Sequence, residues 1–285
     1  MKPATRPGGA RQRFGGVRRS VRLFQGFRHQ FDDEAEYYSF LADDTLALVE
    51  EQMPVAGTRV VDIGGGRGYF SRAFRRAGAE SVLVEPSWEW MGVSGRGLGS
   101  GVVGDGRTLP LSDAAFDISF SSNVLEHVRD PEAFLDEMVR VVRPDGLVFL
   151  SFTNWLSPFG GHATAPWHYL GGEWSARRYE RKHGRPPKNR YGTNLFALHI
   201  GDVLALVRAR PDVDVIDAYP RYYPRWTRPL LKVPGLREVA TWNLAIVLRR
   251  RAEATTHPGP VTLAPDAYRR TDQAIPESSP LSIHA

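Results

Sequence analysis

An alternation of short β-branched runs and amphipathic segments predicts an α/β fold, in which a mostly parallel sheet carries helices on both faces. Glycines or prolines end several of the runs, and one amphipathic segment starts at Pro131, a favoured first position for a helix. The predicted strands cover residues 59–63, 81–85, 101–103, 116–121, 147–152, 213–216 and 241–248. Helices are predicted between them at residues 69–77 and 132–142.

The ends of the chain differ from this central region. Residues 1–15 contain prolines and a glycine pair and are expected to form a disordered basic arm. Apolar residues at helical spacing in 16–54 predict two helices that form a cover, and residues 55–250 form the main domain. Residues 251–285 contain five prolines among polar residues and are expected to be a disordered tail.

Residues 153–200 interrupt the alternation with glycines and aromatic side chains. A loop-rich stretch of this length inside a compact domain is usually functional, so we interpret it as a lid that carries the substrate site.

The chain has no apolar run of the roughly 18–20 residues that a membrane span needs. The arginine-rich start has no apolar core of a secretory signal, and we expect a cytoplasmic protein.

The composition excludes several classes of protein. The chain has no cysteine, which excludes disulfides, cysteine-ligated zinc, iron–sulfur clusters and a cysteine nucleophile, and we predict no metal site. The net charge of +5 comes from residues 1–31, where eight basic residues precede the first acid, Asp32. Because the rest of the chain has slightly more acidic than basic residues, we expect no specific nucleic-acid partner. Only four of the 37 basic residues are lysine, which suggests a GC-rich bacterial genome.

A glycine loop follows the strand at residues 59–63. The motif consists of Asp62 and then Gly64, Gly66 and Gly68 at alternate positions. Glycines allow a sharp turn and a close approach of the backbone to a ligand, and a helix N-terminus follows. Dinucleotide-binding loops place their third glycine one residue later, where this chain has Tyr69. The loop therefore predicts a nucleotide-like cofactor of another kind.

Together with segments further along the chain, the loop resembles the class I S-adenosylmethionine (SAM) dependent methyltransferases, particularly their type 11 group. Glu85 ends the second strand, and the segments that follow in the family's order are residues 104–111, 113–117, 121–128 and 140–146. The resemblance covers residues 56–152. It implies a Rossmann-like, doubly wound, mostly parallel seven-stranded sheet and SAM as the cofactor.

The resemblance also implies how SAM is held. Asp62, Gly64, Gly66 and Gly68 would lie near its methionine end, and Glu85 would accept hydrogen bonds from its ribose hydroxyls. Two pairs of residues complete the expected cofactor site, one around adenine and one in the methyl-donor pocket. These pairs are Asp105 with Gly106, and Ser122 with Asn123.

No catalytic residue is assigned from the sequence, because a sulfonium donor needs a base only when the nucleophile arrives protonated. His162, His168 and Glu173 in the lid are candidates, and so is His127. The alternative for the lid histidines is a hydrogen bond to the loop backbone, and for His127 a structural or pocket-lining role.

The predicted activity is transfer of a methyl group from SAM to a small-molecule, lipid or glycan acceptor, most simply to an oxygen. No Asn/Asp-Pro-Pro-Tyr/Phe motif follows the fourth strand, which argues against methylation of DNA bases or glutamine. Two alternatives stay open. The arginine and phenylalanine helix within residues 16–31 could hold the enzyme at an anionic membrane near a lipid-linked acceptor, or the protein could bind SAM without catalysis.

Overall fold

The computed structural model describes residues 16–28, 34–91 and 101–252. The chain divides into a unit of residues 1–255 and a second unit of residues 256–285. That second unit lies outside the described residues, and so do the predicted arm at residues 1–15 and nearly all of the predicted tail.

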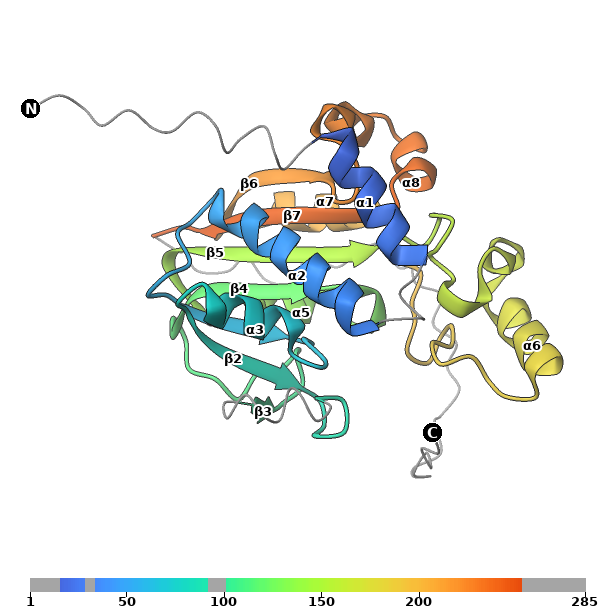
Figure 1. The fold of residues 1–285 in the computed structure, drawn as a ribbon, viewed down its shortest axis with the longest axis horizontal. Coiled ribbons are helices and arrows are strands. Elements are labelled where there is room, and N and C mark those ends of the chain that lie inside the picture. Colours follow the sequence, from blue (N-terminus) through green and yellow to red (C-terminus); the bar gives the residue numbers. More distant parts are fainter. Residues whose placement is uncertain (1–15, 29–33, 92–100, 253–285) are drawn as a thin grey trace, which may run out of the picture. The chain divides into compact units, whose positions relative to one another are not determined.

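A seven-stranded sheet forms the centre of the first unit (Figure 1). The strand order is β3-β2-β1-β4-β5-β7-β6, and β7 runs antiparallel to the other six strands. The strands are β1 (Arg59–Ile63), β2 (Glu80–Glu85), β3 (Gly101–Val103), β4 (Phe116–Ser122), β5 (Val142–Thr153), β6 (Val213–Pro220) and β7 (Asn243–Arg250). This arrangement confirms the predicted doubly wound, mostly parallel α/β fold.

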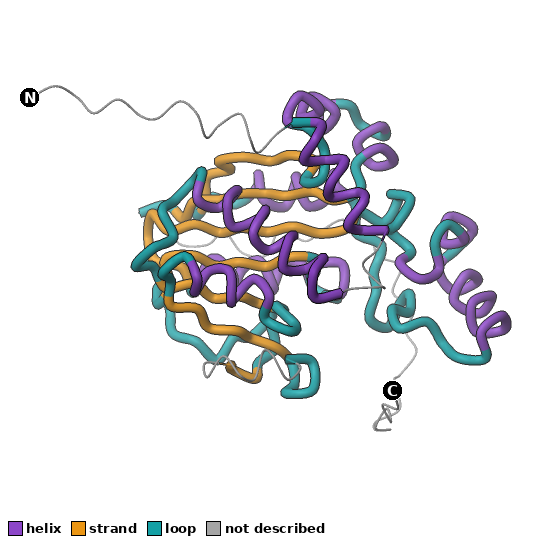
Figure 2. Tube along the Cα trace, in the orientation of Figure 1, coloured by secondary structure: helices purple, strands orange, loops and turns teal. Residues whose placement is uncertain are grey.

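Helices cover both faces of the sheet (Figure 2). One apolar core joins alternate strand residues to α1 (Val17–Arg28), α2 (Glu34–Glu50) and α3 (Tyr69–Arg76). The other core joins the remaining strand residues to α5 (Pro131–Arg140) and α7 (Ile200–Ala209). The two cores use alternate residues of the same strands because successive side chains of a strand point to opposite faces.

The segment between β5 and α7 is more regular than predicted. It contains α6 (Gly172–His183) and two short 3₁₀ helices, η2 (His162–Thr164) and η3 (Trp167–Leu170). The expectation of a loop-rich stretch was therefore wrong for residues 172–183. The helix was missed because α6 buries only Gly172, Ser175 and Ala176, so no apolar stripe marks it in the sequence.

The parallel strands all end at the same edge of the sheet, so the segments that follow them lie close to one another. The arrowheads of β2, β4 and β5 in Figure 1 point to the side on which α6 lies. The strand order reverses between β1 and β4, which lie side by side and continue into helices on opposite faces. In open α/β sheets, ligands bind outside the carboxyl ends of the strands at such a reversal. Two further helices, η4 (Arg225–Lys232) and α8 (Leu236–Ala240), join β6 to β7.

Candidate functional site

The glycine loop turns sharply between β1 and α3. Gly64, Gly66 and Gly68 have φ angles of 74°, 57° and 73°, in the left-handed region that favours glycine. A Cβ atom at Gly64 would lie 2.5 Å from Val124 Cγ2, just beyond β4. A Cβ atom at Gly66 would meet no atom within 4 Å. The loop is therefore packed against the end of β4 at Gly64 and open at Gly66.

Asp62 holds the loop and the following helix together. Its Oδ2 accepts hydrogen bonds from the Ser71 hydroxyl at 2.7 Å and the Ser71 backbone N–H at 3.0 Å. The side chain is fully buried, and this burial raises the pKa of Asp62 to about 7. A Cβ atom at Gly65 would lie 2.4 Å from Asp62 Oδ2, so the packing of Asp62 also requires a glycine at position 65. Asp62 shapes the loop through contacts within the protein.

Glu85 reaches the same loop from the end of β2. Its Oε1 accepts a hydrogen bond from the Gly66 backbone N–H at 2.5 Å. The side chain is buried, and burial raises the pKa of Glu85 to about 7, with a further increase from the nearby Asp62 carboxylate. The structure thus joins two predicted cofactor residues, Glu85 and Gly66, by a direct contact.

Asp105 and Gly106 lie in the turn after β3. The Asp105 carboxylate is about half exposed and accepts hydrogen bonds from the backbone N–H and the guanidinium of Arg107. These contacts lower the pKa of Asp105. A Cβ atom at Gly106 would lie 2.4 Å from Phe134 Cε2 on α5. The packing of α5 therefore requires a glycine at this position, whichever ligand lies nearby.

Ser122 and Asn123 follow at the end of β4. The Ser122 hydroxyl accepts a hydrogen bond of 2.8 Å from Arg221 Nη1. Asn123 has a φ of 58°, and its Oδ1 accepts a hydrogen bond of 2.7 Å from Asn243 Nδ2. Sequence reasoning missed both Arg221 and Asn243, because neither belongs to a motif and both approach from the far end of the chain.

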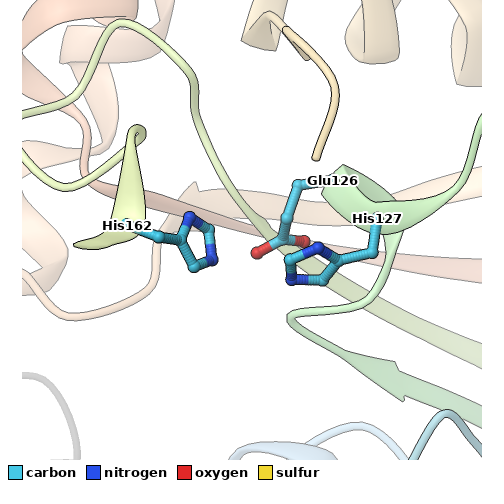
Figure 3. A group of neighbouring side chains, drawn as sticks. All are labelled: Glu126, His127 and His162. Atoms are coloured by element: carbon cyan, nitrogen blue, oxygen red, sulfur yellow. The ribbon is translucent and has the colours of Figure 1, made fainter. Parts of the chain in front are cut away.

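A cluster of three side chains lies beyond β4 (Figure 3). Glu126 and His127 belong to a short 3₁₀ helix, η1 (Leu125–His127), and His162 begins η2 within residues 153–200, the predicted lid. One ligand-type atom from each of the three lies within 4.8 Å of the others. Burial lowers the pKa of both imidazoles, which favours their neutral forms. The structure brings two of the four catalytic candidates together and adds Glu126, which sequence reasoning had not selected.

The other two catalytic candidates lie apart from this cluster. His168 is buried, and its Nε2 lies 3.1 Å from the Trp155 carbonyl oxygen and 3.2 Å from that of Ser157. These contacts match the alternative in which a lid histidine bonds to loop backbone. Glu173, in the first turn of α6, is half exposed and lies 3.9 Å from Arg190.

Comparison with known proteins places the chain in a family. Residues 61–150 match the family described as a methyltransferase domain. An uncharacterized methyltransferase of Mycobacterium sp. (strain KMS) is 47% identical over 239 residues, which cover 81% of this chain and 94% of the relative. The chain belongs to this methyltransferase family. Another uncharacterized methyltransferase, from Mycobacteroides abscessus, is 43% identical over 248 residues, covering 82% of this chain and 95% of the relative.

Solved structures share the fold of this methyltransferase. A protein of Pyrococcus horikoshii OT3 has a TM-score of 0.53 at 18% identity, covering 76% of this chain and 92% of its own. An S-adenosylmethionine dependent methyltransferase from Mesorhizobium loti has a TM-score of 0.50 at 21% identity, covering 73% and 98%. The resemblance inferred from the sequence is confirmed, and with it SAM as the cofactor and a methyl acceptor as the substrate.

The first helix of the methyltransferase packs against Phe159 and Trp242. In α1, the Phe27 ring lies 4.9 Å from that of Phe159 in the lid and 4.3 Å from that of Trp242 before β7. Arg19 is buried and pairs with Asp44 of α2 at 2.6 Å. These contacts fit the predicted cover. Among the described residues, no helix is long and apolar enough to span a membrane.

Proposed function

We propose that the protein transfers the methyl group of SAM to an oxygen atom of a small-molecule, lipid or glycan acceptor. The observation that carries the proposal is the contact between the Glu85 carboxylate and the Gly66 N–H, which unites the ends of β1 and β2. A carboxylate there suits two ribose hydroxyls, and the open side of Gly66 suits a close approach of the ligand to the backbone.

The proposed position of SAM follows the carboxyl edge of the sheet. Its methionine end lies at the glycine loop, which Asp62 holds to α3, and its ribose lies at Glu85. Adenine lies near Asp105 and Gly106, where the Asp105 carboxylate exchanges part of its contact with Arg107 for the exocyclic amine. The methyl group points toward Ser122 and Asn123.

The chemistry is a direct displacement. A lone pair on the acceptor oxygen forms the new bond to the methyl carbon while the carbon–sulfur pair leaves with the neutral sulfide. Much of the rate enhancement comes from alignment of the oxygen, the methyl carbon and the sulfur. The acceptor hydroxyl also has to lose its proton. Glu126, His127 and His162 lie beyond β4 on the lid side, and this is where we place the acceptor.

Calorimetry with SAM tests the donor site. Replacement of Glu85 by alanine should weaken SAM binding by about 1.5–3 kcal/mol, because a charge-assisted hydrogen bond is lost, and Asp62→Ala should also weaken it. Glu80→Ala is the matched control, because Glu80 is an exposed glutamate on the same strand. Equal SAM affinity in the Glu85, Asp62 and control variants would refute the site.

The acceptor class is tested by transfer of a labelled methyl group from SAM to separated lipid, glycan and small-molecule fractions of a bacterial extract. An ether product is supported by two results. The label should be stable to mild base, and no label should be transferred when the hydroxyl groups of the acceptor have been blocked. Label in amine-containing products alone would contradict oxygen methylation. Binding of SAM with no label transferred to any fraction would favour the non-catalytic alternative.

One observation keeps the membrane alternative open. Val17, Val21 and Phe24 form an exposed apolar stripe on α1, at helical spacing and flanked by arginines. Such a stripe can rest on an anionic lipid surface. Flotation with anionic vesicles would compare the full chain with the Val17→Ser, Val21→Ser variant. Equal recovery of the two proteins with the vesicles would exclude α1 as the contact.

A further inference from the structure

The Glu126, His127 and His162 cluster joins two distant parts of the chain. Glu126 and His127 lie in η1, directly after β4, whereas His162 begins η2 in the lid. Figure 3 shows the two imidazole rings on either side of the Glu126 carboxylate, directed toward one another. The ring centroids of the two histidines are 5.1 Å apart. Three groups that can each donate a lone pair thus converge on one small volume.

In each of these side chains, one polar atom already has a partner that fixes its orientation. His127 Nδ1 lies 2.6 Å from the Asn194 carbonyl oxygen, and His162 Nδ1 lies 3.2 Å from that of Gly160. Because a carbonyl only accepts, each Nδ1 carries the proton, and Nε2 keeps its lone pair. Glu126 Oε1 accepts a hydrogen bond from the Thr153 backbone N–H. Histidines that bind metals are usually held in this way through their second nitrogen.

The other Glu126 oxygen has no such partner. The side chain is 1% exposed, and within the described ranges Oε2 has no hydrogen-bond donor. A buried carboxylate oxygen without a donor is costly, and a bound cation would compensate for it. Lys188 carries a positive charge that acts on His127, and this charge opposes a bound cation because like charges repel.

We propose that Glu126, His127 and His162 bind one divalent first-row transition-metal ion, such as Zn²⁺. Two imidazoles and one carboxylate form a common ligand set for these ions, whereas Mg²⁺ and Ca²⁺ prefer oxygen ligands. With metal–ligand distances of about 2.0–2.2 Å, the three ligand atoms have to move together by roughly 1 Å. Sequence reasoning predicted no metal site, because it had excluded only cysteine-based sites and did not pair Glu126 with a lid residue.

The ion has two consequences. It links the end of β4 to the lid, and three protein ligands leave coordination positions open. An acceptor hydroxyl bound at an open position would lose its proton more readily, because the ion lowers the pKa of a bound oxygen. This second consequence rests on the proposed function, whereas the metal site itself does not.

The test uses the full chain without a histidine tag, stripped of metal with a chelator. In a titration with Co²⁺, the ligand-field absorption should saturate at one Co²⁺ per chain. Calorimetry should likewise give one Zn²⁺ bound per chain. His162→Gly, His127→Gln and Glu126→Gln should each weaken Zn²⁺ binding by at least about tenfold. His162→Gly suits the backbone, because His162 has a φ of 48°. His183→Ala, an exposed histidine of α6, is the control and should bind Zn²⁺ as the unaltered chain does.

Three results would overturn the proposal. These are no Zn²⁺ or Co²⁺ bound per chain, equal Zn²⁺ affinity in the His162→Gly and unaltered chains, or binding of Mg²⁺ in preference to Zn²⁺. Calorimetry with SAM on the same proteins measures the donor site separately, so a failure of the metal site can be distinguished from a failure of the SAM site. Should the variants fold poorly, ¹⁵N spectra of the histidines decide the matter on the unaltered chain: Zn²⁺ must shift the Nε2 resonances of His127 and His162.

Discussion

Arg221 Nη1 donates a hydrogen bond of 2.8 Å to the Ser122 hydroxyl at the end of β4. The guanidinium is fully buried and also donates to the hydroxyls of Ser151 and Thr45, each at 2.7 Å. Because the guanidinium is buried, removal of any one of these hydroxyl acceptors should lower the stability of the fold. Arg221 follows β6, the strand at the edge of the sheet, and from there fixes the wall of the proposed methyl-donor pocket.

We expect Ser151→Ala to destabilise the protein by about 1–3 kcal/mol, because one buried N–H of Arg221 loses its acceptor. Ser119→Ala is the matched control: Ser119 is a buried serine of β4 whose hydroxyl has no partner in the described part of the chain. It should change the free energy of unfolding by less than about 0.5 kcal/mol. Urea unfolding of the two variants measures both, and equal losses would contradict the role of Arg221.

The glycine loop offers a second matched pair. Both Gly64→Ala and Gly66→Ala force alanine to a positive φ, at roughly 1–2 kcal/mol. Only Gly64→Ala adds a collision with Val124, so it should unfold at a lower temperature than Gly66→Ala. Gly66→Ala should instead reduce SAM affinity by more than its modest loss of stability suggests. Differential scanning calorimetry and SAM titration measure the two effects; a Gly66→Ala variant with unchanged SAM affinity would contradict the proposed ligand position.

Binding of SAM should depend on pH through Glu85. The pKa of Glu85 is about 7 in the unliganded protein, so the carboxyl is largely protonated at pH 6. Ribose hydroxyls favour the ionised form, so binding should release a proton and tighten by up to about tenfold per pH unit toward pH 7. The dependence should level off above that value. Measurements below pH 7 avoid the titration of the α-amino group of SAM.

Calorimetry at pH 6.5 in two buffers of different ionisation enthalpy measures the proton release. Glu85→Gln should reduce it, whereas Asp62, whose pKa is also raised to about 7, continues to titrate in that variant. Equal proton release in the Glu85→Gln variant and the unaltered chain would show that Glu85 does not ionise on binding.

The contact between the cover and the lid can be tested at Phe27. Phe27→Ala removes the ring that touches Phe159, so we expect faster amide hydrogen exchange at residues 157–165. Val21→Ala, at an exposed position of the same helix, should leave exchange there unchanged. Mass spectrometry of peptides from this segment provides the measurement. Equal exchange in both variants would mean that α1 does not hold the lid.

The sequence predicted the central sheet well, because buried strands carry their own signal. The bounds of β1, a buried strand, agree with the prediction and β4 ends one residue later, whereas β5 begins at Val142 instead of residue 147. The helices α6 and α7 were not predicted. In α6 the exposed polar residues outnumber the few small buried ones, so it lacks the periodicity that marks a helix between two layers.

The candidate site was predictable in part. Asp62 and Glu85 belong to a motif with fixed spacing, and the structure joins both to the glycine loop. Arg221 was not predictable, since a buried arginine and an exposed one look alike in a single sequence. The pairing of Glu126 with His162 depends on how the lid folds back across the sheet edge, a contact over 36 residues that no local pattern records.

Trp242 contacts both α1, in the predicted cover, and the predicted lid. Its ring lies 4.3 Å from Phe27 of α1 and 4.2 Å from Phe159 of the lid. If either α1 or the predicted lid moves away, the Trp242 ring loses one of its two aromatic contacts. The free energy of moving one segment therefore depends on whether the other is in place. We expect release of the demethylated cofactor and entry of the next acceptor to share one opening event. Turnover would then show a single slow relaxation rather than two, with a rate set by the aromatic contact.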